Sequence, residues 1–224
     1  MRLNNKTILV TGANRGIGRA IAEELATRPV NLLLGMRDVT KYQPIQNSTA
    51  LSIKPVKLDL GSKASIDKCL DGLDLSKLDV LINNAGQFTS GPLQRIDLDA
   101  MYSMFQVNLV GLAHLTSRLL PDLLKRPQAK IVNNASIAGY AYFPLNSTYS
   151  ATKAGVVGFS EALRRELAET HVSVLHLVTP GVDTEMLDKV EATYKDDEKP
   201  IQLARIPAAE WAKIQTARAR QCRG

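Results

Sequence analysis

Short apolar runs that alternate with longer segments of helical period are the feature that most restricts the fold of this chain. The first run, at residues 7–10, leads almost directly into a helical pattern at residues 17–28. Strands and helices that alternate in this way are typical of βαβ units. Several later runs are apolar throughout, as expected for strands covered by helices on both faces. The pattern predicts an α/β fold with one doubly wound, Rossmann-like parallel sheet.

Six strands are predicted, at residues 7–10, 30–36, 53–58, 80–83, 130–133 and 172–178. Pro55 lies in the third strand and has no N–H for a central ladder, so this strand is expected at an edge of the sheet. The dinucleotide-binding strand order 3-2-1-4-5-6 places the third strand there. Helices are predicted at residues 17–28, 62–70, 99–125, 148–169 and 207–218, with Pro207 in a first helical turn. Residues 191–200 are predicted to form a charged loop.

Length and composition fit one globular domain. The 224 residues are 45% apolar and 22% charged, which allows a sizeable core and argues against long disorder. We find no internal repeat and no change of composition that would divide the chain. Residues 1–224 are therefore expected to form a single domain.

Charge, hydropathy and cysteine content exclude several classes of protein. The net charge is +6, but residues 201–224 contribute +4 of it, as a short basic tail without interleaved aromatic residues, so no nucleic-acid partner is expected. No apolar run approaches the ~20 residues that span a bilayer, and the N-terminus lacks a secretory signal. We therefore expect a cytoplasmic protein without membrane association. Two distant cysteines and three histidines without ligand spacing predict no disulfide and no metal site.

A glycine-rich loop follows the first strand and precedes a helical pattern. Its glycines are spaced Gly-x-x-x-Gly-x-Gly. Glycines permit a tight turn and let a diphosphate approach the N–H groups at the helix N-terminus. A plain strand-to-helix turn is the alternative, because this is not the commonest Gly-x-Gly-x-x-Gly spacing. The predicted phosphate-binding residues are Gly12, Asn14, Arg15, Gly16, Ile17 and Gly18.

The residues after the second strand indicate which dinucleotide is bound. An acid at this place holds a ribose 2′-hydroxyl, whereas an arginine accepts a 2′-phosphate. Met36 occupies the strand tip, Arg37 follows it, and Arg15 can add a second positive charge. NADP(H) is therefore the preferred cofactor, with NAD(H) as the alternative if Asp38 points inward. The alternative for Arg37 itself is an exposed charge that pairs with Asp38 and has no role in cofactor binding.

Asp59 lies at the tip of the third strand, beside Leu60. Its carboxylate is placed to accept a hydrogen bond from the exocyclic amine of an adenine. A turn or capping residue before Ser62 is the other interpretation. We include both Asp59 and Leu60 among the predicted cofactor-binding residues.

Tyr149 and Lys153 stand four residues apart in a predicted helix, so both side chains point in the same direction. At ~4 Å and an effective dielectric constant of ~20, a cation stabilises an anion by roughly 4 kcal/mol. Such an interaction would lower the pKa of a phenol from ~10 by about three units. The pair therefore predicts a tyrosine that exchanges protons near neutral pH, although this spacing also occurs in many helices without function.

In combination, these residues resemble the classical short-chain dehydrogenase/reductase family over nearly the whole chain. Further matching elements are Asn83-Asn84-Ala85-Gly86, Asn108, Ser136 thirteen residues before Tyr149, and Pro180-Gly181 after the sixth strand, all in family order. The resemblance implies one dinucleotide-binding and catalytic domain. It also implies an oxidoreductase that interconverts a small-molecule carbonyl and a secondary alcohol by hydride transfer. A non-catalytic dinucleotide-binding or interaction protein with the same fold is the alternative.

The resemblance also implies roles for individual residues. Tyr149 would be the general acid and base, and Ser136 would hydrogen-bond the substrate oxygen. Lys153 would lower the phenol pKa and bind the nicotinamide ribose. Asn108 would distort its helix and hold a water that relays protons to Lys153. Residues 185–206 and Trp211 would lie near the substrate mouth. The remaining implied cofactor-binding residues are Asn84, Ala85, Gly86, Pro180, Gly181, Val182 and Thr184, the last against the nicotinamide carboxamide.

The C-terminus departs from the family pattern. Family members usually carry a seventh strand after the helix predicted at residues 207–218, and this strand often helps to build the oligomer. Here the sequence ends at Gly224. We therefore expect six strands without the usual seventh, in a truncated product, a natural short variant, or a protein whose sheet edge is covered in another way. The sequence is compatible with both a homodimer and a homotetramer.

Overall fold

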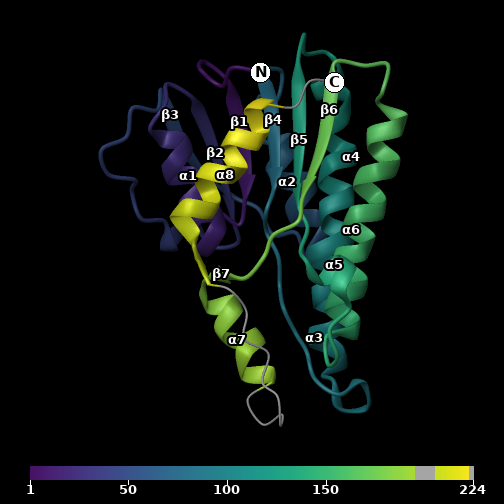
Figure 1. Cartoon of the computed structure of the whole chain (residues 1–224). Helices are drawn as coiled ribbons and strands as arrows, with labels where there is room; N and C mark the ends of the chain where they lie inside the picture. Colours follow the sequence, from purple (N-terminus) through teal and green to yellow (C-terminus); the bar gives the residue numbers. More distant parts are fainter. Residues whose placement is uncertain (195–204, 222–224) are drawn as a thin grey trace.

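A six-stranded parallel sheet forms the centre of the computed structural model, which describes residues 1–194 and 205–221 (Figure 1). The order β3-β2-β1-β4-β5-β6 confirms the predicted fold and strand order. Pro55 lies in the edge strand β3, opposite Leu34 of β2, where its missing N–H leaves no central ladder incomplete. The strands are β1 (Thr7–Thr11), β2 (Asn31–Met36), β3 (Ser52–Lys57), β4 (Leu78–Asn83), β5 (Ala129–Asn134) and β6 (Val172–Leu177).

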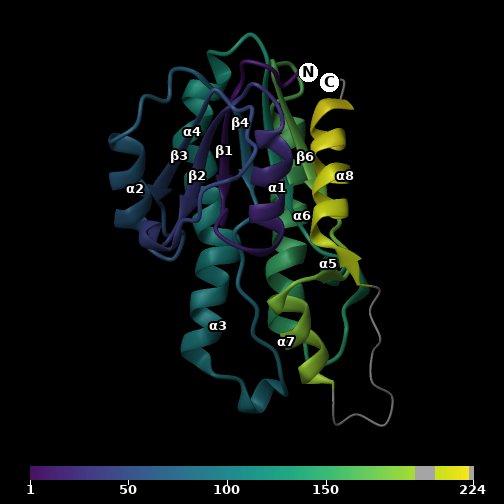
Figure 2. The same ribbon diagram turned by 90° about the vertical axis from the view of Figure 1, so that its left-hand side faces the viewer.

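Helices cover both faces of this sheet (Figures 1 and 2). Ile8 and Val10 of β1 pack in the core beneath α1 (Gly16–Ala26) and α8 (Ala208–Gln221), whereas Leu9 packs toward the opposite helical layer. That layer contains α2 (Lys63–Asp71), α4 (Gly111–Leu124) and α6 (Ser147–Glu166). Burial on both faces explains why the strands are apolar throughout. Within the described ranges, no helix is long and apolar enough to cross a membrane.

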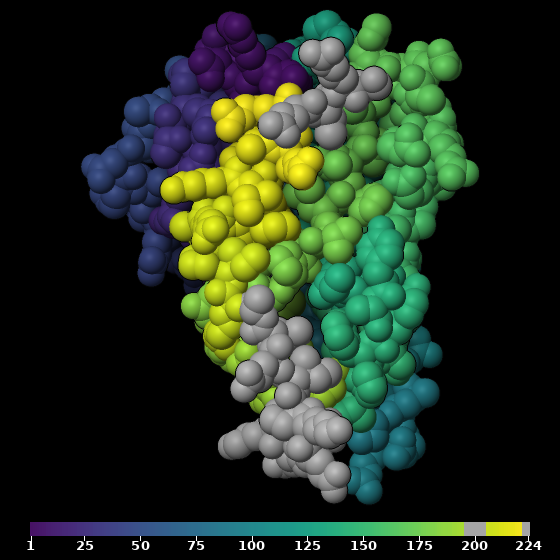
Figure 3. Space-filling model, in the orientation of Figure 1, coloured from purple at the N-terminus to yellow at the C-terminus, as the bar shows by residue number. Residues whose placement is uncertain are grey.

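The C-terminal helix α8 lies on the outside of the molecule against α1 (Figure 3). Ala212 and Ala219 turn inward and are buried in the same core as α1. The ammonium group of Met1 donates a hydrogen bond of 3.0 Å to the carbonyl of Arg220, near the end of α8. A positive charge is favourable there because the last carbonyls of a helix carry partial negative charge. The N-terminus therefore helps to hold α8 in place.

The helix predicted at residues 99–125 is interrupted. It consists of α3 (Leu98–Phe105), a π-helical turn η3 (Gln106–Val110) and α4. Asn108 lies in the π turn, so the local distortion that the family resemblance implied is present. Gly111, which follows the turn, packs so closely that a Cβ atom would lie 2.2 Å from the Leu60 carbonyl oxygen. The interruption thus coincides with a close approach to the loop after β3.

Three further expectations about local structure were wrong. A second, two-stranded parallel sheet joins β7 (Val182–Asp183) to β8 (Ile206–Pro207), so one sheet does not account for the whole chain. Pro207 therefore ends a strand instead of beginning α8, since its fixed φ suits an extended conformation as well as a first helical turn. The predicted loop at 191–200 begins inside α7 (Glu185–Thr193), and its residues 195–200 lie outside the described residues. Short elements η1 (Val39–Lys41), η2 (Leu93–Arg95) and α5 (Ala138–Ala141) complete the described fold.

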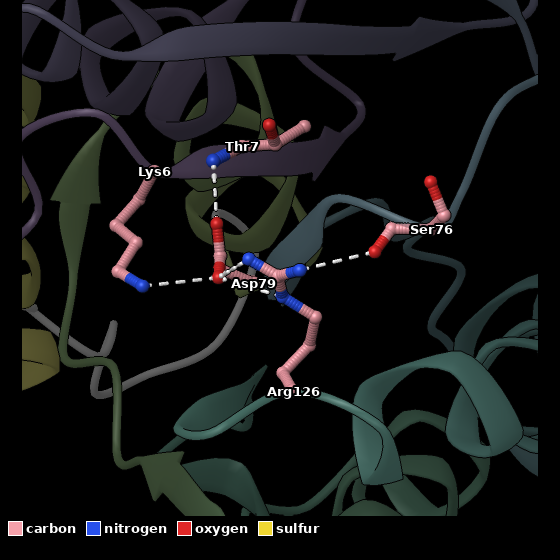
Figure 4. Close-up of polar contacts among 5 residues, drawn as sticks. All are labelled: Lys6, Thr7, Ser76, Asp79 and Arg126. Atoms are coloured by element: carbon pink, nitrogen blue, oxygen red, sulfur yellow. Dashed lines mark hydrogen bonds and ion pairs between the residues drawn. The ribbon is translucent and has the colours of Figure 1, made fainter.

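Asp79 joins the amino-terminal ends of β1 and β4 to the end of α4 (Figure 4). Its buried carboxylate accepts hydrogen bonds from Lys6 Nζ at 3.1 Å and from the Thr7 N–H at 3.0 Å. Arg126 donates to the same carboxylate through Nε at 3.0 Å and Nη2 at 2.9 Å, and through Nη1 to the carbonyl of Ser76. This charge cluster fixes the edge of the sheet opposite to the carboxyl ends of the strands.

Asp79→Asn is expected to lower the free energy of unfolding by about 2–3 kcal/mol, because two cations lose the buried charge that pairs with them. Urea denaturation measures the loss. Asp122→Asn, which removes a surface pair with Lys125, serves as the control and should cost less than about 1 kcal/mol. Equal losses in the two variants would show that the Asp79 cluster does not hold the sheet edge.

Candidate active site

A cleft of about 920 Å³ lies at the carboxyl ends of the strands, where ligands bind in open α/β sheets. Residues from the glycine loop, the ends of β2 to β5, α6, α7 and the segment after β6 line it. All predicted cofactor-binding residues line this cleft, and so does Ser136. They are Gly12, Asn14, Arg15, Gly16, Ile17, Gly18, Arg37, Asp59, Leu60, Asn84, Ala85, Gly86, Tyr149, Lys153, Pro180, Gly181, Val182 and Thr184.

The glycine loop is shaped by close backbone contacts. Gly12 and Gly16 have φ values of +66° and +54°, which side chains rarely adopt. At Gly18, a Cβ atom would lie 2.2 Å from the Gly12 carbonyl oxygen and 2.5 Å from Asn84 Nδ2. The N-cap residue of α1, Arg15, makes no side-chain capping hydrogen bond. The first N–H groups of α1 are therefore not capped by this side chain, which fits an anion such as a diphosphate.

Gly18→Ala is expected to destabilise the protein by roughly 2–3 kcal/mol, because the nearest atom to the added methyl group is the main-chain oxygen of Gly12, which cannot move away without a shift of the backbone. The matched control is Gly158→Ala in α6, where an added Cβ meets nothing within 4 Å. That substitution should stabilise the protein by about 0.5–1 kcal/mol through helix propensity. Thermal or urea denaturation of both variants provides the comparison. A neutral Gly18→Ala variant would show that the glycine loop is not closely packed.

Positive side chains gather where the adenosine end of a dinucleotide would lie. Arg37 is exposed on the cleft wall near Lys41 and makes no hydrogen bond or ion pair with other residues in the described parts of the chain. Asp38 does not pair with it. The Asp38 carboxylate accepts hydrogen bonds from the N–H and hydroxyl of Thr40 at 3.0 and 2.6 Å, and these bonds lower its pKa. Arg37 is therefore available to an anionic ligand.

Two other predicted cofactor residues already have protein partners. Arg15 forms an ion pair with Glu185 at the start of α7, and both residues line the cleft. Asp59 lines the cleft and also accepts a hydrogen bond of 2.9 Å from the Gly61 N–H, so the turn interpretation of this residue holds as well. Both residues line the cleft and also have a structural role within the protein.

Tyr149 and Ser136 meet inside the cleft. Both side chains line it, and the edge of Phe88 packs against the Tyr149 ring with centroids 5.0 Å apart. Burial raises the pKa of Tyr149 to about 12, although the nearby Ser136 hydroxyl acts in the opposite direction. The expectation that Lys153 brings this phenol near neutral pH is therefore wrong for the free protein, because desolvation of a buried phenolate outweighs the nearby cation.

Lys153 is buried one helical turn from Tyr149. Its Nζ lies 5.8 Å from the centre of the Tyr149 ring and donates a hydrogen bond of 3.0 Å to the main-chain carbonyl of Asn134. Burial lowers the pKa of Lys153 to about 8. A small change of environment is therefore enough to switch the charge of this amine near neutral pH.

The buried amine makes stability depend on pH. Below about pH 8 the folded protein bears the full cost of a buried ammonium, and this cost disappears as pH rises toward the ordinary lysine pKa of 10.5. Between pH 8 and 10, the unfolding free energy of the wild type should rise relative to that of Lys153→Met, with a total span on the order of 3 kcal/mol. Denaturation at several pH values measures the difference. Parallel curves for the two proteins would contradict a lowered lysine pKa.

Asn108 lies behind the cleft instead of lining it. Its Oδ1 accepts from the Gln87 N–H at 2.7 Å, and its Nδ2 donates to the Gln87 carbonyl at 2.9 Å and to Thr152 Oγ1 at 3.2 Å. Both amide hydrogens are thus used by the protein. The side chain fixes the segment after β4, and Gly86 in that segment approaches both Asn108 and Lys153.

Several cleft features were missed by sequence reasoning. Phe88, Phe143, Met186 and Val190 add apolar side chains to the cleft lining, and the two phenylalanines pack against the cluster that contains Tyr149. Isolated apolar residues give no periodic signal. Asn134 was also missed, although an amide at the end of an apolar strand is a usable signal. Trp211 is not part of the cleft lining and lies on α8, which packs against α1. Within the described ranges, no group of three or more His, Cys, Asp or Glu residues is arranged to hold a metal ion.

Comparison with known proteins matches this geometry. A family model described as short chain dehydrogenase matches residues 6–195. An uncharacterized oxidoreductase of Staphylococcus epidermidis is 32% identical over 189 residues, which are 84% of this chain and 82% of the relative. The 3-oxoacyl-[acyl-carrier-protein] reductase FabG of Escherichia coli is 31% identical over 211 residues, which are 93% of this chain and 84% of the relative.

Solved structures share the fold along nearly the whole chain. The closed form of a serine dehydrogenase complexed with NADP+ has a TM-score of 0.84 and 25% identity, and the match covers 96% of this chain and 90% of that one. A short chain dehydrogenase from Burkholderia cenocepacia has a TM-score of 0.83 and 24% identity, covering 100% of this chain and 87% of that one.

Proposed function

Because the chain belongs to the short-chain dehydrogenase/reductase family of oxidoreductases, we propose that it interconverts a carbonyl compound and a secondary alcohol, with NADP(H) as the preferred cofactor. One observation carries most of this proposal. The Tyr149 phenol meets the Ser136 hydroxyl in the same cleft that the glycine loop lines. A proton donor and a dinucleotide-binding turn thus open into one space.

The residues of the cleft fit a nicotinamide dinucleotide. When bound, such a cofactor supplies or accepts the hydride. The uncapped N-terminus of α1 would hold the diphosphate, Lys153 would hold the nicotinamide ribose, and Thr184 would contact the carboxamide. Ala85 carries only a methyl group and Gly86 only a hydrogen atom at the cleft wall, which would permit a close approach of the adenosine ribose.

The pKa of Tyr149 decides whether the phenol holds a proton that it can donate to the substrate. Because this pKa is raised to about 12, the phenol is protonated at neutral pH and is a proton donor to a carbonyl oxygen. Ser136 would hydrogen-bond the same oxygen and orient it. The Lys153 ammonium near the ring stabilises the phenolate that remains after proton donation. In the free protein at neutral pH, the phenol is therefore in the protonated form that carbonyl reduction requires.

The preference for NADP(H) rests on the positive charges at the adenosine end. Arg37 is unpaired among the described residues, Lys41 lies on the same wall, and Asp38 is occupied by Thr40. An unpaired guanidinium binds a phosphate in bidentate fashion. The NADP+ complex of the related serine dehydrogenase supports the same preference.

The substrate class is inferred from the apolar side chains of the cleft lining. Phe88 and Phe143 pack against the cluster that contains Tyr149, and Met186 and Val190 line the same cleft, so they would offer apolar surface to the groups that flank the reacting carbonyl. The relatives named FabG are reductases of a 3-oxoacyl group, which supports a carbonyl as the reacting group. We propose a ketone or aldehyde with at least one apolar substituent.

Tyr149→Phe is expected to lower the rate of NADPH-dependent ketone reduction by about 10²–10⁴-fold, because the general acid is lost while the diphosphate site is untouched. Turnover is followed by the loss of NADPH absorbance with a panel of ketones and aldehydes. Binding of NADPH, titrated by fluorescence, is the control and should stay close to that of the wild type. Unchanged turnover would exclude Tyr149 as the acid.

Arg37→Ala is expected to weaken NADPH binding by about tenfold or more and to leave NADH binding nearly unchanged, because only NADPH carries the 2′-phosphate. Dissociation constants of both dinucleotides provide the test. Lys63→Ala, in the first turn of α2 and outside the cleft lining, is the matched control. Equal losses for NADPH and NADH would overturn the assignment of the phosphate site.

A further inference from the structure

A chain of side-chain amides, half-buried at Asn84 and buried at Asn134 and Gln215, crosses the carboxyl ends of the strands and reaches α8. Thr11 of β1 offers its main-chain carbonyl to Asn84 Nδ2 at 3.1 Å, and Asn84 Oδ1 accepts from Asn134 Nδ2 at 3.0 Å. Asn134 Oδ1 in turn accepts from the hydroxyl of Thr179 and from Gln215 Nε2, the latter at 3.2 Å. Gln215 belongs to α8 and is buried, so the C-terminal helix takes part in this chain.

The orientation of every amide in the chain follows from one carbonyl group. The Thr11 carbonyl can only accept, so Asn84 must turn its NH₂ group toward it and its oxygen toward Asn134. Asn134 must then donate to Asn84 and offer its own oxygen to Thr179 and Gln215. Gln215 must therefore point its NH₂ group toward the Asn134 oxygen. Each side chain therefore has one orientation that satisfies its neighbours.

Asn134 is also the residue that receives Lys153. Its main-chain carbonyl accepts the Lys153 Nζ hydrogen bond at 3.0 Å. The titratable group that faces this amine is Tyr149, on the same helix. The neighbours of Lys153 on the other elements carry no charge; they are Asn134 of β5, Gly139 of α5 and Gly86 after β4. Among the described residues, the ammonium thus has a carbonyl dipole for its acceptor and no carboxylate.

We propose that Asn134 is a positioning residue, which holds the Lys153 ammonium through its main-chain carbonyl and is itself fixed by Gln215 of α8 and by Thr179. The catalytic consequence rests on the proposed function, in which Lys153 stabilises the Tyr149 phenolate. Helix α8 also packs on α1, whose N-terminus forms part of the cleft. The C-terminal helix is thereby coupled to both ends of the site, although it does not line the cleft.

The test uses two variants that remove the anchor and leave the carbonyl in place. Asn134→Leu removes the amide hub, and Gln215→Met removes the donor on α8 with little change of volume. The matched control is Asn133→Leu. Asn133 is the preceding residue of β5 and is equally buried, but its amide bonds to Ser160 and Asn83 and does not touch Lys153. Every variant is made in the whole 224-residue chain.

The readout is the titration of Lys153 by NMR of protein labelled with ¹³C at lysine Cε, with the signal assigned by its loss in Lys153→Met. A loosened carbonyl stabilises the ammonium less, so Asn134→Leu and Gln215→Met should move the midpoint downward by on the order of half a pH unit or more. Asn133→Leu should leave the midpoint where it is in the wild type. A merely structural role for Asn134 would not separate these variants.

An unchanged or raised midpoint in Gln215→Met would overturn the proposal, and so would an equal shift in Asn133→Leu. If Asn134→Leu does not fold, Gln215→Met and Asn133→Leu decide between the outcomes. The titration needs neither cofactor nor substrate. A failure of the proposed function would appear separately, as wild-type protein that does not oxidise NADPH with any carbonyl compound.

Discussion

The burial of Lys153, which has no carboxylate partner in the described part of the chain, is the constraint on which the site depends. An ammonium that is removed from water must be compensated, and here the compensation comes from the Asn134 carbonyl and the nearby Tyr149 ring. The cost of this arrangement lowers the pKa of the amine to about 8, and the same burial raises the pKa of the phenol to about 12. Burial in the same place thus shifts the two pKa values in opposite directions, because it disfavours the charged form of each group.

The parallel sheet brings the required groups to one edge. Each strand delivers its carboxyl end to the cleft, so segments as distant as the glycine loop, Asn84 and Asn134 become neighbours. At the other edge, the Asp79 charge cluster fixes the start of β1 and β4. The close approach of Gly18 to the Gly12 carbonyl and the Asn84 amide joins the diphosphate end of the cleft to the strand ends. Stability and site geometry therefore share the same contacts.

Periodicity and motifs predicted much of this molecule because they report local properties. The six strands follow from apolar runs, the edge position of β3 from Pro55, and the glycine-loop part of the cleft from glycine spacing. The cleft residues after β4 and β6 were implied only by the family resemblance. The pKa of Tyr149 was predicted in the wrong direction, since a spacing of four residues gives proximity to Lys153 but says nothing about burial. The Asn134–Gln215 contact joins residues 81 positions apart, and no local pattern contains it. The same holds for β7 and β8, which are too short to have a period.

The most direct measurement of the central claim is a crystal structure of the protein with NADP+. We expect the diphosphate at the N-terminus of α1, the 2′-phosphate beside Arg37, and the nicotinamide ring facing the Tyr149 hydroxyl and Ser136. A dinucleotide bound elsewhere, or a Tyr149 hydroxyl that points away from the nicotinamide, would contradict a proton donor and a cofactor acting in one cleft.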